Sequence, residues 1–300
     1  MHSPKHSADD SPAVLAGEAV SPGHLYVVAT PIGHLGDFSP RAQAVLRGVD
    51  RICAEDTRTT GVLLSHFGIS KPMTAVHEHN EDRIATELVE ALRTGSSLAV
   101  VSDAGTPLIS DPGFALVRAA RAAHLPVIAV PGPCAAIAAL SVAGLPSNSF
   151  FFAGFLPHKS RARRQRLQEL GAQSGTVILY ESSHRIEEAL SDLVEVLGSA
   201  RRICLARELT KRFEQSVLLP AGELLAWLRA DSNRARGEFV LVIEDAPAAT
   251  AGRAEAERVL RLLLRELPAS KAAKLAAELT GLRKSELYQI AVDVGAPEDP

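Results

Sequence analysis

Cysteine is scarce in this 300-residue sequence: Cys53, Cys134 and Cys204 stand far apart and never form a CxxC pair. Their odd number excludes a closed disulfide framework, and their spacing matches no zinc site, so we expect a reducing, cytoplasmic compartment. A membrane helix needs roughly 18 uninterrupted apolar residues, and Pro131 and Pro133 break the most apolar stretch. The sequence therefore predicts neither a secreted disulfide scaffold nor a membrane-spanning protein.

Charge of one sign is not in large excess either. The formal net charge of −3 excludes a uniformly basic nucleic-acid-binding protein, although phosphates are bound by local basic patches. With 46% hydrophobic residues, a chain of this length can bury a sizeable core and predicts about two domains. We expect residues 1–22 to be a disordered leader, because they are polar and lack the apolar core of a signal peptide.

Short β-branched runs alternate with helical stretches between residues 23 and 145. Such continuous apolar runs are typical of buried parallel strands, so this segment predicts an N-terminal α/β domain. Ser39 and Asn80 are expected helix N-caps, and Gly95 is an expected helix stop. The expected strands are 25–29, 51–54, 73–76, 97–101 and 126–130.

A second α/β pattern occupies residues 146–245, and its later strands lie close in sequence, which predicts a mixed sheet. Residues 246–253 are small and include a proline, so they are expected to form a linker. Three helical periodicities follow in 254–300, with Ser270 as an expected N-cap and Gly281 as a stop; a helix-turn-helix tail and a simple packing appendage both fit them. The expected strands are 150–154, 176–180, 202–206, 213–219 and 238–244, and the expected helices are 160–172, 184–197 and 220–230.

Loops rich in small and polar residues follow three strands of the first domain. TPIGHLGD (30–37) is not the GxGxxG fingerprint, and no Walker lysine is present, which disfavours nicotinamide and nucleotide-triphosphate chemistry. VSDAGTPLISDPG (101–113) and PGPCA (131–135) expose backbone groups at close range, as a polar cofactor requires. We expect the last two loops to line one pocket at the carboxyl edge of the sheet.

Charged residues follow other strands. AEDTR (54–58) and HEHNE (77–81) place carboxylate, imidazole and guanidinium groups where they can position a hydroxyl, a ribose or a phosphate. The HxH spacing also suits a metal, but no further ligand motif lies nearby, so no metal is expected. A capped, solvated helix start is the alternative for the second segment.

Cations gather in the second domain, where HKSRARRQR (158–166) opens a helix. Cations at a helix N-terminus oppose its dipole, which favours a bound anion there; a solvated basic face is the alternative. ESSHR (181–185) and ARELTK (206–211) repeat the pattern of polar groups after a strand. The two sheets are therefore expected to direct their functional edges at a shared cleft.

Taken together, these segments resemble the tetrapyrrole-methylase superfamily of S-adenosylmethionine enzymes, and within it the 2′-O-methyltransferases of 16S ribosomal RNA that act on a decoding-region cytidine. The resemblance is collinear over residues 23–295 and includes GFLPHKSRARR (154–164), YESSHR (180–185) and GE (237–238). One departure is His34, where the family more often has asparagine.

The resemblance implies an α/β, two-domain tetrapyrrole-methylase (class III methyltransferase) fold with a small C-terminal helical domain, S-adenosylmethionine in the cleft between domains, and a homodimer. By position, the cofactor contacts of the superfamily fall on Pro31, Ser102, Asp103, Ala104, Gly105, Thr106, Ile109, Ser110, Pro133, Cys134, Tyr180, Ala206 and Gly237.

Methyl transfer to a ribose hydroxyl leaves the protein to align the oxygen and accept its proton. The strand-end candidates for this task are Glu55, Asp56, His77, Glu181 and His184. The expected RNA contacts are Arg58, Lys159, Arg161, Arg163, Arg164 and Arg185.

Two other functions fit the resemblance. One is a carbon methyltransferase acting on a porphyrin-like substrate, against which the basic helix, the tail and AEDTR argue. The other is a catalytically silent RNA-binding factor, which predicts no cofactor affinity. The main hypothesis remains that the chain methylates 16S rRNA within the small ribosomal subunit. We expect it to act in the cytoplasm and not to associate with a membrane.

Overall fold

The computed structural model describes residues 20–77, 79–245 and 248–293 and divides the chain into two compact units, one ending at Cys134 and the other beginning at Ala135. The sequence predicted this boundary after Leu145. The difference arises because the helix at 135–142 packs on strands of the second unit. Most of the predicted leader, residues 1–19, lies outside the described residues.

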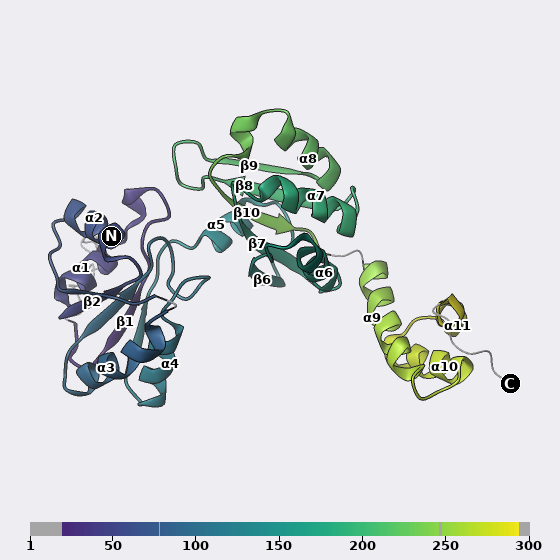
Figure 1. Cartoon of the computed structure of the whole chain (residues 1–300), viewed down its shortest axis with the longest axis horizontal. Coiled ribbons are helices and arrows are strands. Elements are labelled where there is room, and N and C mark those ends of the chain that lie inside the picture. Colours follow the sequence, from purple (N-terminus) through teal and green to yellow (C-terminus); the bar gives the residue numbers. More distant parts are fainter. Residues whose placement is uncertain (1–19, 78, 246–247, 294–300) are drawn as a thin grey trace, which may run out of the picture. The chain divides into compact units, whose positions relative to one another are not determined.

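The first unit contains a five-stranded, fully parallel sheet in the order β3-β2-β4-β1-β5 (Figure 1). The five predicted strands are all present, each within about one residue of its expected ends. The elements are β1 (Leu25–Val28), η1 (Leu35–Asp37), α1 (Pro40–Gly48), β2 (Arg51–Ala54), α2 (Thr57–His66), β3 (Met73–Ala75), α3 (Glu81–Arg93), β4 (Leu98–Val101), α4 (Phe114–Ala122) and β5 (Val127–Val130).

Alternate residues of these short strands enter different cores. Ile52 and Ala54 belong to a cluster with α1 and α2, whereas Cys53 between them packs with α3 and α4. Both faces of the sheet are therefore covered, which explains why the strands are apolar throughout. The expected N-cap at Ser39 is confirmed, because its Oγ accepts from Ala42 N at 3.1 Å.

The strand order also identifies the ligand edge of this sheet. β1 and β4 are neighbours, but the chain leaves β1 towards β2 and leaves β4 towards β5, in opposite directions. Ligands of open α/β sheets bind outside the carboxyl ends of strands at such a switch point. The loops after β1 and β4 are two of the three that the composition indicated; the prediction had paired the loop after β4 with the turn after β5.

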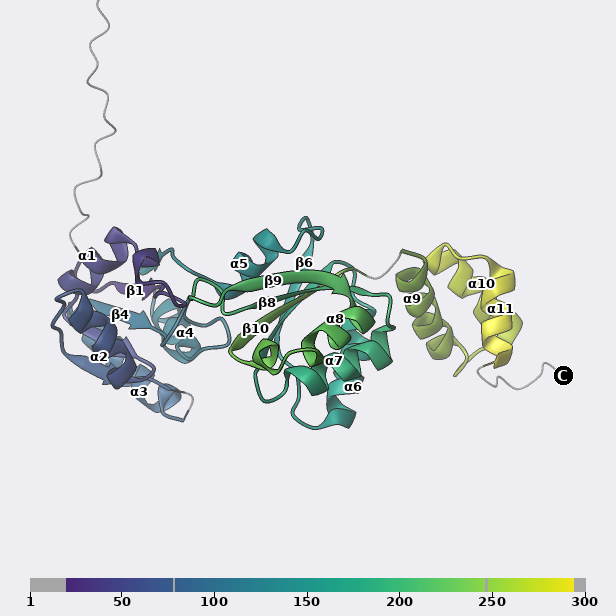
Figure 2. The same ribbon diagram turned by 90° about the horizontal axis from the view of Figure 1, so that it is seen from above.

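The second unit contains a mixed sheet, as predicted, and its strand order is β6-β7-β10-β8-β9. α6, α7 and α8 cover one face of it (Figure 2), and α5 contacts β7 and β10 from the other. The elements are α5 (Ala135–Val142), β6 (Phe150–Phe155), α6 (Ser160–Gly171), β7 (Thr176–Ser182), α7 (Ile186–Leu197), β8 (Arg202–Arg207), β9 (Gln215–Pro220), α8 (Ala221–Arg229), η2 (Ser232–Ala235) and β10 (Glu238–Ile243).

The pairing of this sheet brings its predicted functional segments to one edge. β10 is antiparallel to both β7 and β8, and its residues Glu238 and Phe239 pair with Ser182 and Arg207. β6 runs parallel to β7. The ends of β6, β7 and β8 and the start of β10 therefore lie side by side.

A helical tail ends the described chain, with α9 (Ala248–Leu263), α10 (Ala269–Thr280) and α11 (Lys284–Asp293) around an alanine-rich core. The prediction of a linker over 246–253 is wrong from Ala248 onward, since alanine favours helix more than the small-residue pattern suggested. Ser270 is not an N-cap, because α10 begins at Ala269. Gly281 does end α10, with φ of 74°. No described helix is long and apolar enough to cross a membrane.

Candidate functional site

The loops after β1 and β4 are joined by a backbone bridge. Thr30 N donates to Gly105 O at 2.9 Å, and Gly105 N donates back to Thr30 O at 3.1 Å. The buried Thr30 hydroxyl also donates to Ser102 O at 3.2 Å. Residues 75 apart in sequence are thus fixed at the switch point identified by the strand order.

The loop after β4 is held in an unusual backbone conformation. Leu108 and Ser110 have φ of 73° and 66°, in the left-handed region that non-glycine residues seldom adopt, and Gly105 has φ of 85°. Such residues persist only where surrounding structure holds them, and they concentrate at ligand sites. This geometry supports the prediction that the loop is more than a connection.

The turn after β5 approaches the same bridge. Thr106 Oγ1 donates to Pro133 O at 2.9 Å, which connects this turn to the loop after β4. A Cβ on Gly132 would lie 2.9 Å from the Cβ of Ala29, so only glycine fits there. Pro131 and Gly132 remain exposed and offer backbone groups to a ligand.

Carboxylates dominate this edge of the first unit. Glu55 Oε2 accepts from Asp103 N at 3.2 Å, and Asp103 Oδ1 accepts from Asp56 N at 3.1 Å. Asp111 completes the group through its electrostatic interactions with Glu55 and Asp103. This concentration of negative charge suits a ligand that carries positive charge and hydroxyl groups.

Asp56 is better explained as a structural residue than as a base. Its Oδ1 accepts from Arg58 N at 2.8 Å, which caps α2, and its Oδ2 lies 2.6 Å from Arg58 Nη2. These hydrogen bonds lower the pKa of Asp56 to about 2. A carboxylate with so low a pKa is a weak proton acceptor, so the prediction of Asp56 as the base is not supported. The same ion pair occupies Arg58, an expected RNA contact.

Asp111 was missed by the sequence analysis, which treated it only as part of its loop. Burial, reinforced by the nearby Glu55 carboxylate, raises the pKa of Asp111 from its ordinary value of 3.8 to about 6. Carboxyl groups with raised pKa values concentrate at functional sites. Only the pairing of β2 with β4 brings Glu55 near Asp111, so no local sequence signal reveals this shift.

The raised pKa predicts a pH-dependent stability change for Asp111→Asn. A carboxyl whose folded pKa exceeds its unfolded pKa destabilises the protein above the folded pKa and has no such effect below the unfolded one. We therefore expect Asp111→Asn to be more stable than wild type at pH 7.5 by roughly 1 to 3 kcal/mol, and this advantage to vanish near pH 4.

Urea unfolding at both pH values measures this difference, with Asp82→Asn as a control because the Asp82 side chain is 83% exposed. An advantage of Asp111→Asn that is the same at pH 4 and 7.5 would contradict the assignment. A weaker affinity of this variant for a cationic ligand would show that the carboxylate serves the site.

His77 lies after β3, where its Nδ1 is buried without a hydrogen-bond partner among the described residues. Asn80 is the N-cap residue of α3, as predicted, but its side chain makes no capping hydrogen bond. Its Oδ1 instead accepts from His77 N at 2.9 Å, and its Nδ2 donates to Ala75 O. Asn80 therefore holds the backbone of His77. The His77 and His79 ring centroids are 6.0 Å apart, and no described group of three or more His, Cys, Asp or Glu side chains is arranged to hold a metal.

Glu181 is the most buried candidate base in the second unit. Its side chain is 1% exposed, Oε1 accepts from Ser182 N at 2.9 Å, and Oε2 lies 3.3 Å from Arg185 Nη2. Burial raises the pKa of Glu181, although the Ser182 hydrogen bond and the charge of Arg185 oppose this. His184, by contrast, is exposed in the turn that follows.

The expected cofactor residues of the second unit lie at the same sheet edge. The Tyr180 hydroxyl accepts from Ala136 N at 3.1 Å, and Ala206 is fully buried. Gly237 has φ of 101°, and a Cβ there would lie 2.5 Å from the Glu208 carboxylate. Glu208 itself accepts from Glu238 N at 3.0 Å, so this carboxylate fixes the start of β10.

Four cations in and just before helix α6 were predicted to contact RNA, and the structure argues against two of them. Arg163 is buried with its side chain 3% exposed, and its Nε lies 2.6 Å from Asp192 Oδ2. Arg164 pairs with Asp192 at 2.7 Å and with Glu195. The prediction of Arg163 as an RNA contact is therefore wrong. Arg164 is partly exposed, but its guanidinium group is paired with two acids of α7. Lys159 and Arg161 are exposed at the start of the helix.

Arg185 is also committed to protein groups. Its Nη2 donates to Leu156 O at 2.5 Å as well as to Glu181, and its side chain is 15% exposed. A phosphate contact through its outer nitrogens would require these bonds to break. Lys159 and Arg161 are therefore the two exposed cations of the predicted set that form no ion pair with the described residues.

The first unit supplies carboxylates and exposed backbone groups, which suit the ammonium, the sulfonium and the ribose hydroxyls of S-adenosylmethionine. Glycine at 105 and 132 lets the loops after β4 and β5 pack closely against residues that follow β1, because a Cβ at either position would press on Ile32 or Ala29. The residues present therefore fit this group.

Comparison with known proteins identifies relatives along most of the chain. The family model of Tetrapyrrole (Corrin/Porphyrin) Methylases matches residues 24–225, and the model described as RsmI C-terminal HTH domain matches residues 250–293. "Ribosomal RNA small subunit methyltransferase I" of Xylella fastidiosa (strain Temecula1) is 55% identical over 89% of this chain and 98% of its own. The protein of the same name from Escherichia coli O157:H7 is 53% identical over 91% of this chain and 96% of its own.

Solved structures show the same fold at lower identity. The methyltransferase CobJ has a TM-score of 0.56 and 21% identity, covering 75% of this chain and 95% of its own. Diphthine synthase has a TM-score of 0.58 and 14% identity, covering 74% and 90%. A Thermus thermophilus uroporphyrin-III C-methyltransferase, solved with S-adenosylhomocysteine, has a TM-score of 0.50 and 16% identity, covering 74% and 97%.

Proposed function

Because this chain belongs to the tetrapyrrole (corrin/porphyrin) methylase family, we propose that it transfers the methyl group of S-adenosylmethionine to the 2′-hydroxyl of a cytidine in the decoding region of 16S ribosomal RNA. The observation that carries the proposal is the length of the similarity. Relatives named ribosomal RNA small subunit methyltransferase I match 88–92% of the chain at 45–56% identity. The match thus includes the helical tail, which has its own family model.

The cofactor would be held by the strand-end loops. In the first unit, Ser102 to Thr106 and the turn at Pro133 and Cys134 present backbone groups beside Asp103 and Asp111. Tyr180, Ala206 and Gly237 are the corresponding positions of the second unit. When bound, S-adenosylmethionine supplies a methyl carbon activated by a sulfonium.

The chain must then orient the 2′-hydroxyl and accept its proton. Glu181 is suited to this because its carboxylate is fixed by Ser182 N and Arg185, and because burial raises its pKa above the usual value of a glutamate. A base is most effective when its pKa approaches the working pH. Glu55, His77 and His184 remain the other proposed acceptors.

Lys159 and Arg161 would contact RNA phosphates at the start of α6. Both are exposed. One is the N-cap residue and the other lies in the first helical turn, which contains no acid, so together they leave a positive surface suited to a polyanion. We further propose a cytoplasmic homodimer acting on the small ribosomal subunit.

The test is transfer of labelled methyl groups from S-adenosylmethionine to small ribosomal subunits from cells lacking this methylation. Label in 16S RNA supports the proposal. Cofactor binding without label in RNA would shift the function towards carbon methylation of a porphyrin-like acceptor, and absent cofactor binding would indicate a silent RNA-binding factor.

A further inference from the structure

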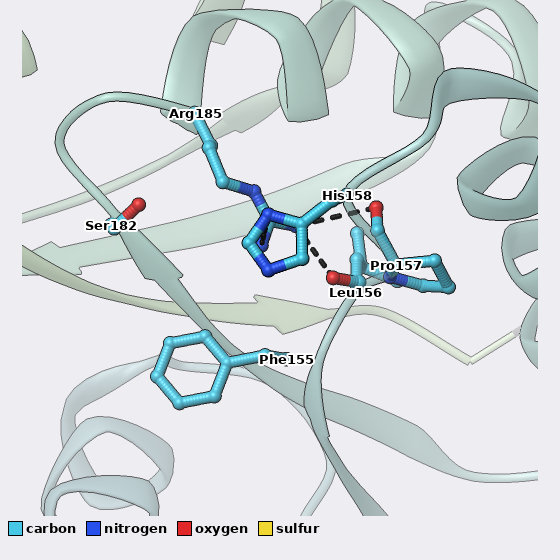
Figure 3. Close-up of a pocket in the computed structure, with 6 residues that line it drawn as sticks. All are labelled: Phe155, Leu156, Pro157, His158, Ser182 and Arg185. Carbon is cyan, nitrogen blue, oxygen red and sulfur yellow. Dashed lines mark hydrogen bonds between the residues drawn. The ribbon is translucent and has the colours of Figure 1, made fainter.

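A cavity of about 530 Å³ opens where β6 and β7 end in the second unit (Figure 3). Its lining residues are Phe155, Leu156, Pro157, His158, Ser182 and Arg185. All six belong to GFLPHK (154–159) or YESSHR (180–185), and the second segment contains the buried Glu181. Its volume falls within the range of small-molecule sites.

One wall of the cavity is an exposed aromatic ring. Phe155 is 53% exposed although it is the last residue of β6. The Tyr180 ring contacts it edge-on, with centroids 5.7 Å apart and planes at 66°. Phe155 is thus fixed on one side and open on the other, as a stacking platform requires.

The opposite side of the cavity has polar residues with groups that form no hydrogen bonds to the described residues. Arg185 is anchored by Leu156 O and Glu181, yet its Nε is buried without a hydrogen-bond partner within the described part of the chain. The Ser182 hydroxyl likewise has no hydrogen bond to any described residue; only its backbone is engaged. In Figure 3 the Phe155 ring lies below a space with Ser182 on one side and His158 with Arg185 on the other.

Basic residues follow the cavity lining directly in sequence. His158 lines it, and Lys159 and Arg161 follow at the exposed start of α6. An aromatic platform beside a cationic surface is the recurring arrangement for unpaired nucleotides, in which the base stacks and the phosphates contact the cations.

We propose that this cavity receives the unpaired pyrimidine base of an RNA nucleotide, stacked on Phe155, with Arg185 Nε donating to its ring nitrogen or carbonyl oxygen and Ser182 Oγ accepting from its amino group. The proposal deepens the proposed function, on which its choice of RNA rests. A cytosine presents this combination of acceptors and a donor along one edge. Placing the base here would bring its ribose towards Glu181, whose Oε2 lies 3.3 Å from Nη2 of the cavity-lining Arg185.

Binding of a fluorescently labelled, single-stranded oligocytidylate to the full chain tests the cavity without any methyl transfer. Fluorescence anisotropy should show about 5- to 100-fold weaker binding for Phe155→Ala, as stacking of one base predicts, and near-normal binding for Phe155→Trp. Ser182→Ala should weaken binding about 2- to 10-fold. Phe151→Ala is the matched control, because Phe151 is exposed on the same strand but does not line the cavity.

The outcomes separate the cavity from the catalytic proposal. Oligocytidylate affinity unchanged in Phe155→Ala, equal losses in Phe155→Ala and Phe151→Ala, or no binding by wild type would overturn the assignment. A loss of S-adenosylmethionine affinity in Phe155→Ala with RNA affinity retained would also overturn it, since the ring would then serve the adenine of the cofactor. Selective loss of RNA binding, in a protein that methylates no ribosomal RNA, would support the cavity and contradict the proposed function alone.

Discussion

Glu181→Gln is expected to lower the turnover of methyl transfer by about 10²- to 10⁴-fold, because it removes the proton acceptor from the 2′-hydroxyl. Glutamine keeps the size of the side chain and an oxygen that can accept from Ser182 N. The affinity for S-adenosylmethionine should therefore change little. In wild type, turnover should rise with pH as Glu181 loses its proton, at a pH above the usual range because burial raises its pKa; the variant should lack this rise.

Single-turnover rates across pH measure this effect, and Glu187→Gln provides the matched control. Glu187 lies on α7, its side chain is 55% exposed, and it pairs with Arg229 at 2.8 Å. Less than a tenfold loss in Glu181→Gln would exclude Glu181 as the base and leave Glu55, His77 and His184 for the same substitution test. A large loss with an unchanged pH profile would assign Glu181 a positioning role through Arg185.

Arg163→Met is expected to destabilise the protein by about 3 kcal/mol, because it removes the buried partner of Asp192 and leaves that carboxylate only Ser160 and the more exposed Arg164. Asp192 also accepts from Ser160 and Arg164, and although burial raises its pKa, the hydrogen bonds from Arg164 and Arg163 lower it below the usual range. The group is therefore charged in the folded protein, and removal of one cation cannot be relieved by protonation at neutral pH.

Arg161→Met gives the matched comparison on the same helix. Arg161 is exposed, so its replacement should leave the free energy of unfolding within about 0.5 kcal/mol of wild type. Its effect should instead fall on RNA, with the slope of log affinity against log salt reduced by about one. Urea unfolding and salt titrations distinguish the two arginines. Equal stability of the two variants would contradict the buried ion pair, and an unchanged salt slope in Arg161→Met would contradict the phosphate contact.

Arg163 illustrates what sequence analysis can and cannot supply. It was grouped with its neighbours by charge, but it stands in helical register with Leu167 and Leu170, which are buried on the same face of α6. That periodicity was a usable signal that Arg163 points inward. Its acid, Asp192, lies 29 residues away on α7, and nothing local predicts that pairing.

The strands were predictable for a physical reason. Buried parallel strands such as β4 are apolar at every residue, so they stand out between polar helices and loops. Less predictable were features set by other contacts. α5 joins the second unit because it packs on β7 and β10, and the side chain of the N-cap residue Asn80 accepts from His77 N instead of from the first turn of α3.

In the candidate site, too, local features could be predicted from the sequence, whereas features set by tertiary contacts could not. Composition identified the loops that the structure bridges at Thr30 and Gly105, because dense small and polar residues after a strand are a local property. The raised pKa of Asp111 depends on burial and on a neighbouring strand. That both sheet edges face one cleft stays a prediction, as do the individual cofactor contacts.

The most direct test of the central claim is to digest 16S RNA after the labelled reaction with small subunits and to identify the labelled nucleoside by mass spectrometry. We predict 2′-O-methylcytidine in the decoding region with wild type, and its loss with Glu181→Gln. Label on a base carbon, on another nucleotide, or nowhere in the RNA would contradict the account.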